Sequence, residues 1–484
     1  MTADDLSPPS RAARVGLWLG PALGLAVFGL LADSSLSVAG QRLAGVTVLM
    51  ACWWMTEAVP VAVTALLPLA LFPLLGIRSA AETAPAYGHD LIWLFFGGFQ
   101  LAFALERWHL HRRMAAAIVR RIGTRGDRLV LGFMLAVGVL SMWLMNTSIT
   151  LMMLPVALAV ARGFEGEEGG PFGAALMLGI AYAASVGGMG TYLGTAPNLV
   201  FAGVARKFGV DVSFTAWMAF AAPLALLLVL LIWVYLTRLA LPVPRRALPP
   251  EHPAMASLLA PPAPWTSGAV RVAIIFALAV VAWVSNRWVF AALGFPARFV
   301  TDSTIAIAAA VALFLVPAGG GARGAVLDYR DTVRTPWHIL LLFGGGFALA
   351  GGFDQSGLSA WLGAGLARAV DGLPLGLVIL AVVLLVTFLT EVTSNTATAT
   401  VLLPVIGGLA VAMGVPPVSL MVPATLAASC AFMLPVATPP NAIVYGTGLF
   451  GLPVMARVGF AINLGSAVVI TVWTLLVGPS TLGG

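Results

Sequence analysis

Four short polar segments interrupt otherwise apolar stretches of this sequence. Two of them, at 145–148 and 393–396, read Met-Asn-Thr-Ser and Thr-Ser-Asn-Thr. The other two, at 194–198 and 437–441, read Gly-Thr-Ala-Pro-Asn and Ala-Thr-Pro-Pro-Asn. Proline breaks a helix and frees carbonyls one turn earlier, while Asn, Ser and Thr supply uncharged oxygens and donors. At the centre of a membrane, such breaks can hold an anion and a hard cation such as sodium side by side.

The polar segments belong to an internal repeat. Residues 145–147 are echoed at 394–396, and residues 194–198 at 437–441. A Gly-rich stretch at 96–102 also recurs at 344–350, so three matches follow in the same order at nearly the same spacing. A single Asn-Thr pair in an apolar segment is usually a contact between helices. Paired occurrence in register favours a functional site instead.

Composition places the chain in a membrane. Of its 484 residues, 60% are hydrophobic and 9% charged, whereas a soluble domain is about one quarter charged. Lipid offers no hydrogen bonds, and the apolar runs are too long and too uniform for barrel strands, so we expect an all-α integral membrane protein. The net charge of +6 comes from arginines between apolar runs, which indicates membrane orientation and not nucleic acid. No pattern for a nucleotide or other organic cofactor occurs, and no cluster of catalytic residues predicts an enzyme.

The spacing of the apolar runs predicts about 11 transmembrane helices. Two further runs, 129–161 and 374–413, carry a polar segment at their centres and are predicted to be re-entrant hairpins. The arginine distribution favours a cytoplasmic N-terminus in the cell inner membrane. With that orientation the two hairpins enter from opposite faces, so the halves form an inverted-topology repeat, which is typical of secondary transporters.

At these segments the sequence resembles the divalent-anion:sodium symporter family, with its Ser-Asn-Thr signature at two hairpin tips followed by Thr-Pro-Pro-Asn-like breaks. The match extends from Glu57 through the second break. The resemblance implies a homodimer in lipid, each protomer having a scaffold and an elevator-type transport domain. The expected division is 1–124 scaffold with a cytoplasmic surface helix at 107–124, 125–240 transport domain, 241–267 cytoplasmic linker, 268–373 scaffold, and 374–484 transport domain.

The resemblance also implies a set of binding residues. The substrate contacts would be Asn146, Thr147, Ser394, Asn395, Thr396, Thr438 and Pro439. Sodium would bind in two places, the first near Ser141, Asn146 and Gly194, and the second near Thr390, Thr393, Asn395 and Ala437. The sequence departs from the family pattern at Met145, where the first signature has Ser. A thioether is a poor ligand for a hard cation, so we expect a weaker first sodium site or an anion exchanger with looser coupling.

Two further features carry expectations. Glu391 lies three residues before Ser394 and is expected to hydrogen-bond the backbone of the second tip, the alternative being that it carries a proton. The basic segment 107–121 is expected to lie on the membrane surface with its arginines at lipid phosphates. His109 and His111, within that segment, are expected to be solvated.

These observations predict a secondary transporter, not an enzyme. Its substrate would be a C4-dicarboxylate of the succinate or malate class, coupled to sodium, because moving each negative charge inward costs about 2.3 kcal/mol per 100 mV. Co-transported cations offset that cost. The alternatives are a sodium-independent dicarboxylate exchanger and an inorganic anion transporter of the sulfate or arsenite type.

Overall fold

The computed structural model describes residues 10–166, 170–247, 264–296 and 299–482. The chain is almost entirely helical, as predicted. One small antiparallel sheet, β1 (Pro317–Gly319) and β2 (Ala322–Ala325), was not predicted. Gly319, Gly320 and Gly321 all have positive φ, a backbone conformation that glycine adopts at little cost, and this sharp turn brings the two strands together.

The first half of the chain runs through α11. Its helices are α1 (Arg11–Leu30), α2 (Val38–Thr56), α3 (Val61–Leu74), α4 (Ala80–Thr83), η2 (Ala84–Gly88), α5 (Asp90–Arg107), α6 (Leu110–Ile122), α7 (Gly126–Ser141), α8 (Asn146–Glu165), α9 (Pro171–Gly188), α10 (Ala196–Ala205), η3 (Arg206–Phe208), α11 (Phe214–Val234) and the π-helical extension η4 (Tyr235–Ala240). The interrupted run forms two helices, α7 and α8, joined by the short segment 142–145. The next run breaks between α9 and α10, at the Gly-Thr-Ala-Pro-Asn segment.

The second half repeats this order. Its helices are α13 (Ser267–Ala292), α14 (Asp302–Leu315), η5 (Tyr329–Arg334), α15 (Trp337–Ser356), α16 (Leu358–Ala369), α17 (Leu375–Thr390), α18 (Asn395–Ala412), α19 (Val418–Ala427), η6 (Pro435–Ala437), α20 (Pro439–Tyr445) and α21 (Leu452–Thr481). Helices α17 and α18 are joined by 391–394, and the next run breaks between α19 and α20. Both halves therefore contain a helical hairpin followed by a broken helix, as the repeat predicts.

The helices have the lengths of membrane segments. Within the described ranges, nine helices are long and apolar enough to cross a membrane, and four shorter apolar ones include α14 and α17. The arms α8 and α18 of the two hairpins qualify by length and composition alone. The chain is thus a multi-pass membrane protein. The number of crossings, the re-entrant character of the hairpins and their entry from opposite faces stay predictions.

The surface helix differs from its expected bounds. Helix α5 continues to Arg107, and the chain then turns through His109, which has a φ of 54°, before α6 begins. Arg107 does not lie free for lipid, because it pairs with Asp331 at 2.6 Å. His111 is 6% exposed and its Nδ1 lies 3.0 Å from the carbonyl oxygen of Leu105. The expectation of a solvated side chain is therefore wrong for His111, and burial lowers its pKa.

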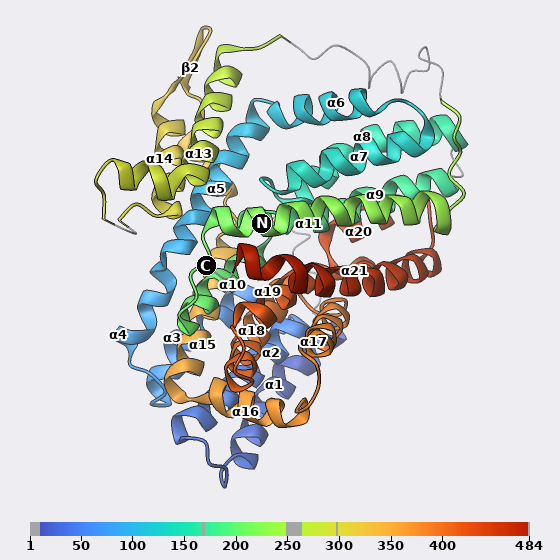
Figure 1. Cartoon of the computed structure of the whole chain (residues 1–484). Coiled ribbons are helices and arrows are strands. Elements are labelled where there is room, and N and C mark those ends of the chain that lie inside the picture. The colour runs from blue at the N-terminus through green and yellow to red at the C-terminus, as the bar shows by residue number, and fades with distance from the viewer. Residues whose placement is uncertain (1–9, 167–169, 248–263, 297–298, 483–484) are drawn as a thin grey trace.

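Two groups of helices can be distinguished. Helices α5, α13 and α14 pack on one another at one side of the molecule, and α1, α2, α3 and α15 pack together below them in Figure 1. The hairpin α7–α8, the broken helices and the long helices α11 and α21 form the other group, in which α11 lies beside α21. Helix α6 passes over the first hairpin and packs against α7.

Candidate functional site: the two hairpin tips and helix breaks

The first tip gathers oxygen atoms around Ser141. This residue ends α7, and Asn146 begins α8. The Ser141 hydroxyl lies within hydrogen-bonding distance of Asn146 Oδ1 and 2.8 Å from the carbonyl oxygen of Ala184. A hydroxyl has one hydrogen and cannot donate to both acceptors at once. The cluster therefore has an excess of oxygen lone pairs, which suits a hard cation.

Glycines keep the first cluster open to the helix break. A Cβ placed on Gly188 would lie 3.0 Å from the carbonyl oxygen of Gly194 and 3.1 Å from Asn146 Oδ1. A Cβ placed on Gly194 would lie 2.8 Å from the carbonyl oxygen of Ser141. Any side chain at either position would fill the space between tip and break. The structure thus brings together all three residues predicted for the first sodium site, Ser141, Asn146 and Gly194.

The second tip repeats the arrangement with different residues. Thr390 ends α17, and its hydroxyl lies 2.7 Å from Asn395 Oδ1 and 3.0 Å from the carbonyl oxygen of Ala428. Thr390, Asn395 and Ala428 therefore correspond to Ser141, Asn146 and Ala184. Sequence reasoning missed the two alanines, because a main-chain carbonyl leaves no mark on residue type.

Thr393 and Ala437, the other two residues predicted for the second sodium site, are arranged differently from Thr390 and Asn395. The Thr393 hydroxyl bonds to the carbonyl oxygen of Leu389 at 2.8 Å and to Thr398 Oγ1 at 2.5 Å. Its side chain is therefore engaged away from the Thr390–Asn395 oxygens, which leaves its carbonyl as a possible ligand. Ala437 is buried at the end of η6, within the second break and next to Thr438.

Both breaks are held by an asparagine that the sequence analysis did not single out. Asn198 is fully buried, and its amide nitrogen lies 2.7 Å from the carbonyl oxygen of Thr191 and 3.1 Å from that of Gly188. Asn441 is equally buried, and its amide nitrogen lies 3.0 Å from the carbonyl oxygen of Ala431 and 3.0 Å from that of Leu434. These amides replace donors that a continuous helix would have supplied. Their presence at the end of both break segments was the available sign.

The helices that begin at these segments present free N–H groups. Helices α8, α18 and α10 all begin without a side-chain cap. An uncapped N-terminus carries unpaired donors and a partial positive charge, which favours an anion. Within the described residues, no protein group pairs with the hydroxyls of Thr147 and Thr396, and Ser394 is exposed. All three can therefore reach a ligand.

The second break has fewer free polar groups for a substrate than was expected. Thr438 is buried, and its Oγ1 already accepts a hydrogen bond from the backbone N–H of Asn441 at 3.3 Å. Pro439 is exposed at the first position of α20. A substrate could thus contact Pro439 directly, whereas contact with Thr438 would use its hydroxyl hydrogen.

The two halves interlock at the breaks. Helix α10 packs against α18 and α19 of the second half, while α20 packs against α8 and α9 of the first. Tyr182, in the middle of α9, donates its hydroxyl to the carbonyl oxygen of Phe432 at 2.7 Å. Residues about 250 positions apart are therefore joined at the centre of one helical group.

Glu391 orders the second break, not the second tip. It is 3% exposed, and its carboxylate accepts from the N–H groups of Phe432 at 2.6 Å, Met433 at 2.9 Å and Leu434 at 3.1 Å. The amide of Asn463 donates to it at 2.7 Å. The expectation that it bonds the tip backbone is wrong, because α17 ends with this side chain turned toward the unwound segment after α19.

Met145 faces a neighbouring helix. A small cavity beside the first tip is lined by Met145, Trp143, Leu193 and the α5 residues Phe95, Gly98, Phe99 and Ala102. The thioether thus lies among apolar groups, where sulfur–aromatic contacts are favourable. Ser394, the corresponding residue of the second tip, also makes no cap with its hydroxyl. The structure gives no reason for the missing hydroxyl at Met145 to weaken the first oxygen cluster.

Replacing Met145 with serine should therefore change sodium affinity little. We expect the half-saturating sodium concentration of Met145→Ser to stay within about threefold of the parent value, because only apolar contacts are lost and such losses act mainly on packing. Uptake measured against sodium concentration checks this. A tenfold gain in sodium affinity would restore the interpretation that the side chain at this position coordinates the ion.

Comparison with known proteins bears directly on these motifs. A family model described as the sodium:sulfate symporter transmembrane region matches residues 15–479. The chain belongs to the divalent-anion:sodium symporter family. It is accordingly a membrane transporter and not an enzyme.

Relatives in this family are similar along their whole length. The sodium-dependent dicarboxylate transporter SdcS of Staphylococcus saprophyticus is 40% identical over 479 residues, covering 97% of this chain and 92% of the relative. SdcS of Staphylococcus aureus is 39% identical over 486 residues, covering 98% and 93%.

Two solved transporters share the fold at low identity. The YdaH transporter of Alcanivorax borkumensis aligns with a TM-score of 0.58 at 16% identity, covering 97% of this chain and 99% of its own. MtrF of Neisseria gonorrhoeae aligns with a TM-score of 0.59 at 13% identity, with the same coverage. At these identities the likeness concerns the fold alone.

Proposed function

We propose that this symporter-family protein moves a C4-dicarboxylate such as succinate or malate across the inner membrane together with sodium. The observation that carries the proposal is the matched pair of oxygen clusters, Ser141–Asn146 and Thr390–Asn395, each beside an uncapped helix N-terminus. The clusters suit sodium and the N-termini suit carboxylates. The printed names of relatives about 40% identical, sodium-dependent dicarboxylate transporters, support this choice of ions.

In the proposed site, each cluster binds one sodium. Ser141, Asn146 and Gly194 line the first, with Thr390, Asn395 and the carbonyls near Thr393 and Ala437 in the second. The dicarboxylate lies between the tips, in reach of the residues Asn146, Thr147, Ser394, Asn395, Thr396, Thr438 and Pro439. Two sodium ions balance the two carboxylate charges, so that the loaded site crosses the membrane without net charge and without the cost of about 2.3 kcal/mol per charge per 100 mV.

The two helical groups suggest how the site moves. We assign 125–240 and 374–484 to the transport domain, and 1–124 and 268–373 to the scaffold of a homodimer. The site lies within the transport domain, which would move as a body against the scaffold. The linker 241–267 would connect them on the cytoplasmic face, with the N-terminus on the same side, although most of that linker lies outside the described residues.

Uptake of labelled succinate into proteoliposomes tests the function. With two sodium ions per succinate, a tenfold inward sodium gradient should concentrate succinate by up to about 100-fold, because each ion contributes a factor of ten. A potassium gradient of the same size is the control and should drive no accumulation. Equal uptake with either cation would contradict sodium coupling, and stimulation only by internal succinate would indicate exchange. Accumulation of sulfate in place of succinate would reassign the substrate.

A further inference from the structure

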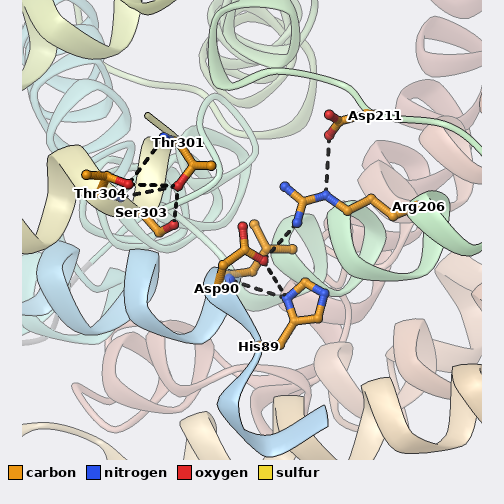
Figure 2. A network of polar contacts seen from close by, with 8 residues as sticks. His89, Asp90, Arg206, Asp211, Thr301, Ser303 and Thr304 are labelled. Atoms are coloured by element: carbon orange, nitrogen blue, oxygen red, sulfur yellow. Dashed lines mark hydrogen bonds and ion pairs between the residues drawn. The ribbon is translucent and has the colours of Figure 1, made fainter. Parts of the chain in front are cut away.

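An arginine on the face away from α6 bridges the two helical groups. Arg206 lies in η3, directly after α10, and its Nη1 is 2.8 Å from Asp90 Oδ1 at the start of α5. Its Nε is 3.3 Å from Asp211 Oδ1, five residues further along its own segment. Figure 2 shows the guanidinium between the two carboxylates, with the His89 ring below it reaching the same oxygen of Asp90. One ion pair thus crosses between the groups and the other does not.

Weaker contacts follow the same boundary. The backbone N–H of Phe214 donates to Asp302 Oδ2 at 3.2 Å, and the Thr215 hydroxyl donates to the carbonyl oxygen of Trp283 at 3.0 Å. The rings of Phe214 and Trp283 stack with centroids 5.0 Å apart. Residues 206–215, which we call the docking segment, therefore rest on α5, α13 and α14 through one ion pair and several neutral contacts.

The ion pair lies beside open space. Cavities of about 420 and 280 Å³ are both lined by Asp90, Arg206, Asp211 and Thr301. The side chains of Arg206 and Asp90 are 34% and 37% exposed. Water can therefore reach both charges, and an ion pair that water reaches is held weakly and separates easily. By contrast, separating a fully buried pair would leave uncompensated charges at high cost.

Each charge also has a second partner on its own side. Asp90 Oδ1 lies 2.9 Å from Nδ1 of His89, which precedes it in the chain. Arg206 has Asp211, which belongs to the same docking segment. If the docking segment leaves α5, the Arg206–Asp90 contact is the one that breaks, and both residues keep a polar neighbour. Among other ion pairs of the described residues, Arg107–Asp331 and Arg334–Glu106 each lie within one group, and Asp127 pairs with Arg125 and Arg238 within the other.

We propose that Arg206 and Asp90 form a reversible latch, which holds the docking segment against α5 in the conformation seen here and opens each time the transport domain moves. This inference rests on the proposed function, in that it assigns the two groups to moving and fixed domains. The latch adds stability to one end state only. Its strength therefore sets the population of that state, while the oxygen clusters at the tips set what is bound.

Labelling of a cysteine behind the docking segment tests the latch without any substrate. Ser303, at the start of α14, is 7% exposed and lines the larger cavity. In a Ser303→Cys background, Asp90→Asn should speed labelling by a membrane-impermeant maleimide about three- to fivefold, as expected for loss of an exposed ion pair. Asp90→Glu is the matched control, because it keeps the charge and should label at the background rate. Identical rates for Asp90→Asn and the background would overturn the latch.

Cross-linking supplies a second measurement. In the double variant Asp90→Cys and Arg206→Cys, a short reducible bis-methanethiosulfonate reagent should stop succinate uptake, and a reductant should restore it. Each single cysteine variant is the control and should keep its uptake after the same treatment. Undiminished uptake by the cross-linked pair would also overturn the latch. Absence of succinate uptake in the parent protein would contradict the proposed function alone, because the labelling experiment needs no transport.

Discussion

Replacing Asn395 with alanine is expected to abolish sodium-driven dicarboxylate uptake while leaving the protein folded. The change removes the oxygen that lies 2.7 Å from the Thr390 hydroxyl, leaving the carbonyl of Ala428 and the hydroxyl to bind a cation. Loss of groups that only support a metal ligand lowers affinity 10- to 100-fold, so loss of a direct ligand should cost about 100-fold or more. Asn395 also begins α18, whose uncapped N-terminus is proposed to bind the anion.

The effect should appear as a loss of function and not of stability. Asn395 is partly exposed at a hairpin tip, so its truncation opens no cavity in the core. Uptake is measured together with the gel-filtration elution profile and the thermal unfolding of the purified variant. Thr474→Val is a suitable control, because the Thr474 hydroxyl bonds only within its own helix, to the carbonyl oxygen of Ile470. Normal uptake by Asn395→Ala would remove the second cluster from the proposed site.

The tips and breaks could be predicted because their polar residues and prolines differ from the apolar residues around them. Polar residues and prolines inside apolar runs create groups that need partners at membrane depth, and the repeat showed which of them correspond. The run 129–161 thus indicated the hairpin formed by α7 and α8, and Asn146 and Asn395 fell at the helix starts. Their partners Ser141 and Thr390 lie five residues earlier, which is within the reach of a local motif.

Features created by distant contacts could not be predicted. The carbonyls of Ala184 and Ala428 are main-chain groups, so any residue type could have supplied them. The direction of the Thr393 side chain depends on how α17 ends, and the backbone partners of Glu391 lie about 40 residues further along the chain. The Arg206–Asp90 pair joins residues 116 positions apart. Neither charge stands out in a sequence whose arginines mostly mark membrane faces.

The two halves of the chain differ at the position of Glu391. In the first half, the corresponding position before the tip is Met142, and the N–H groups of Met189 and Gly190 are bonded by nearby carbonyls of the same chain segment. In the second half, three consecutive N–H groups turn to the Glu391 carboxylate instead. Besides Asn441, the second break therefore depends on the Glu391 carboxylate for its shape, whereas the first, besides Asn198, uses backbone hydrogen bonds at these positions.

Glu391→Gln should accordingly destabilise the protein and stop transport. The glutamine amide keeps one acceptor oxygen and places an NH₂ group toward N–H donors. Hydrogen bonds to a charged group contribute about 1.5–3 kcal/mol each, so losing two of them should cost about 3 kcal/mol or more of unfolding free energy. Thermal unfolding and uptake at saturating sodium check this. Asn463→Ala, which removes one donor and leaves the charge, should show a smaller loss of both.

The same variant distinguishes a structural carboxylate from a proton carrier. A residue that only carries a proton can be neutralised without harm to the fold, so Glu391→Gln would then unfold at the parent temperature and lose the pH dependence of uptake. A residue that shapes the break gives the opposite result, in which stability falls at every pH and sodium protects the variant less than the parent. The second outcome is expected, because the carboxylate has four donors around it, and three of them are the backbone N–H groups of the second break.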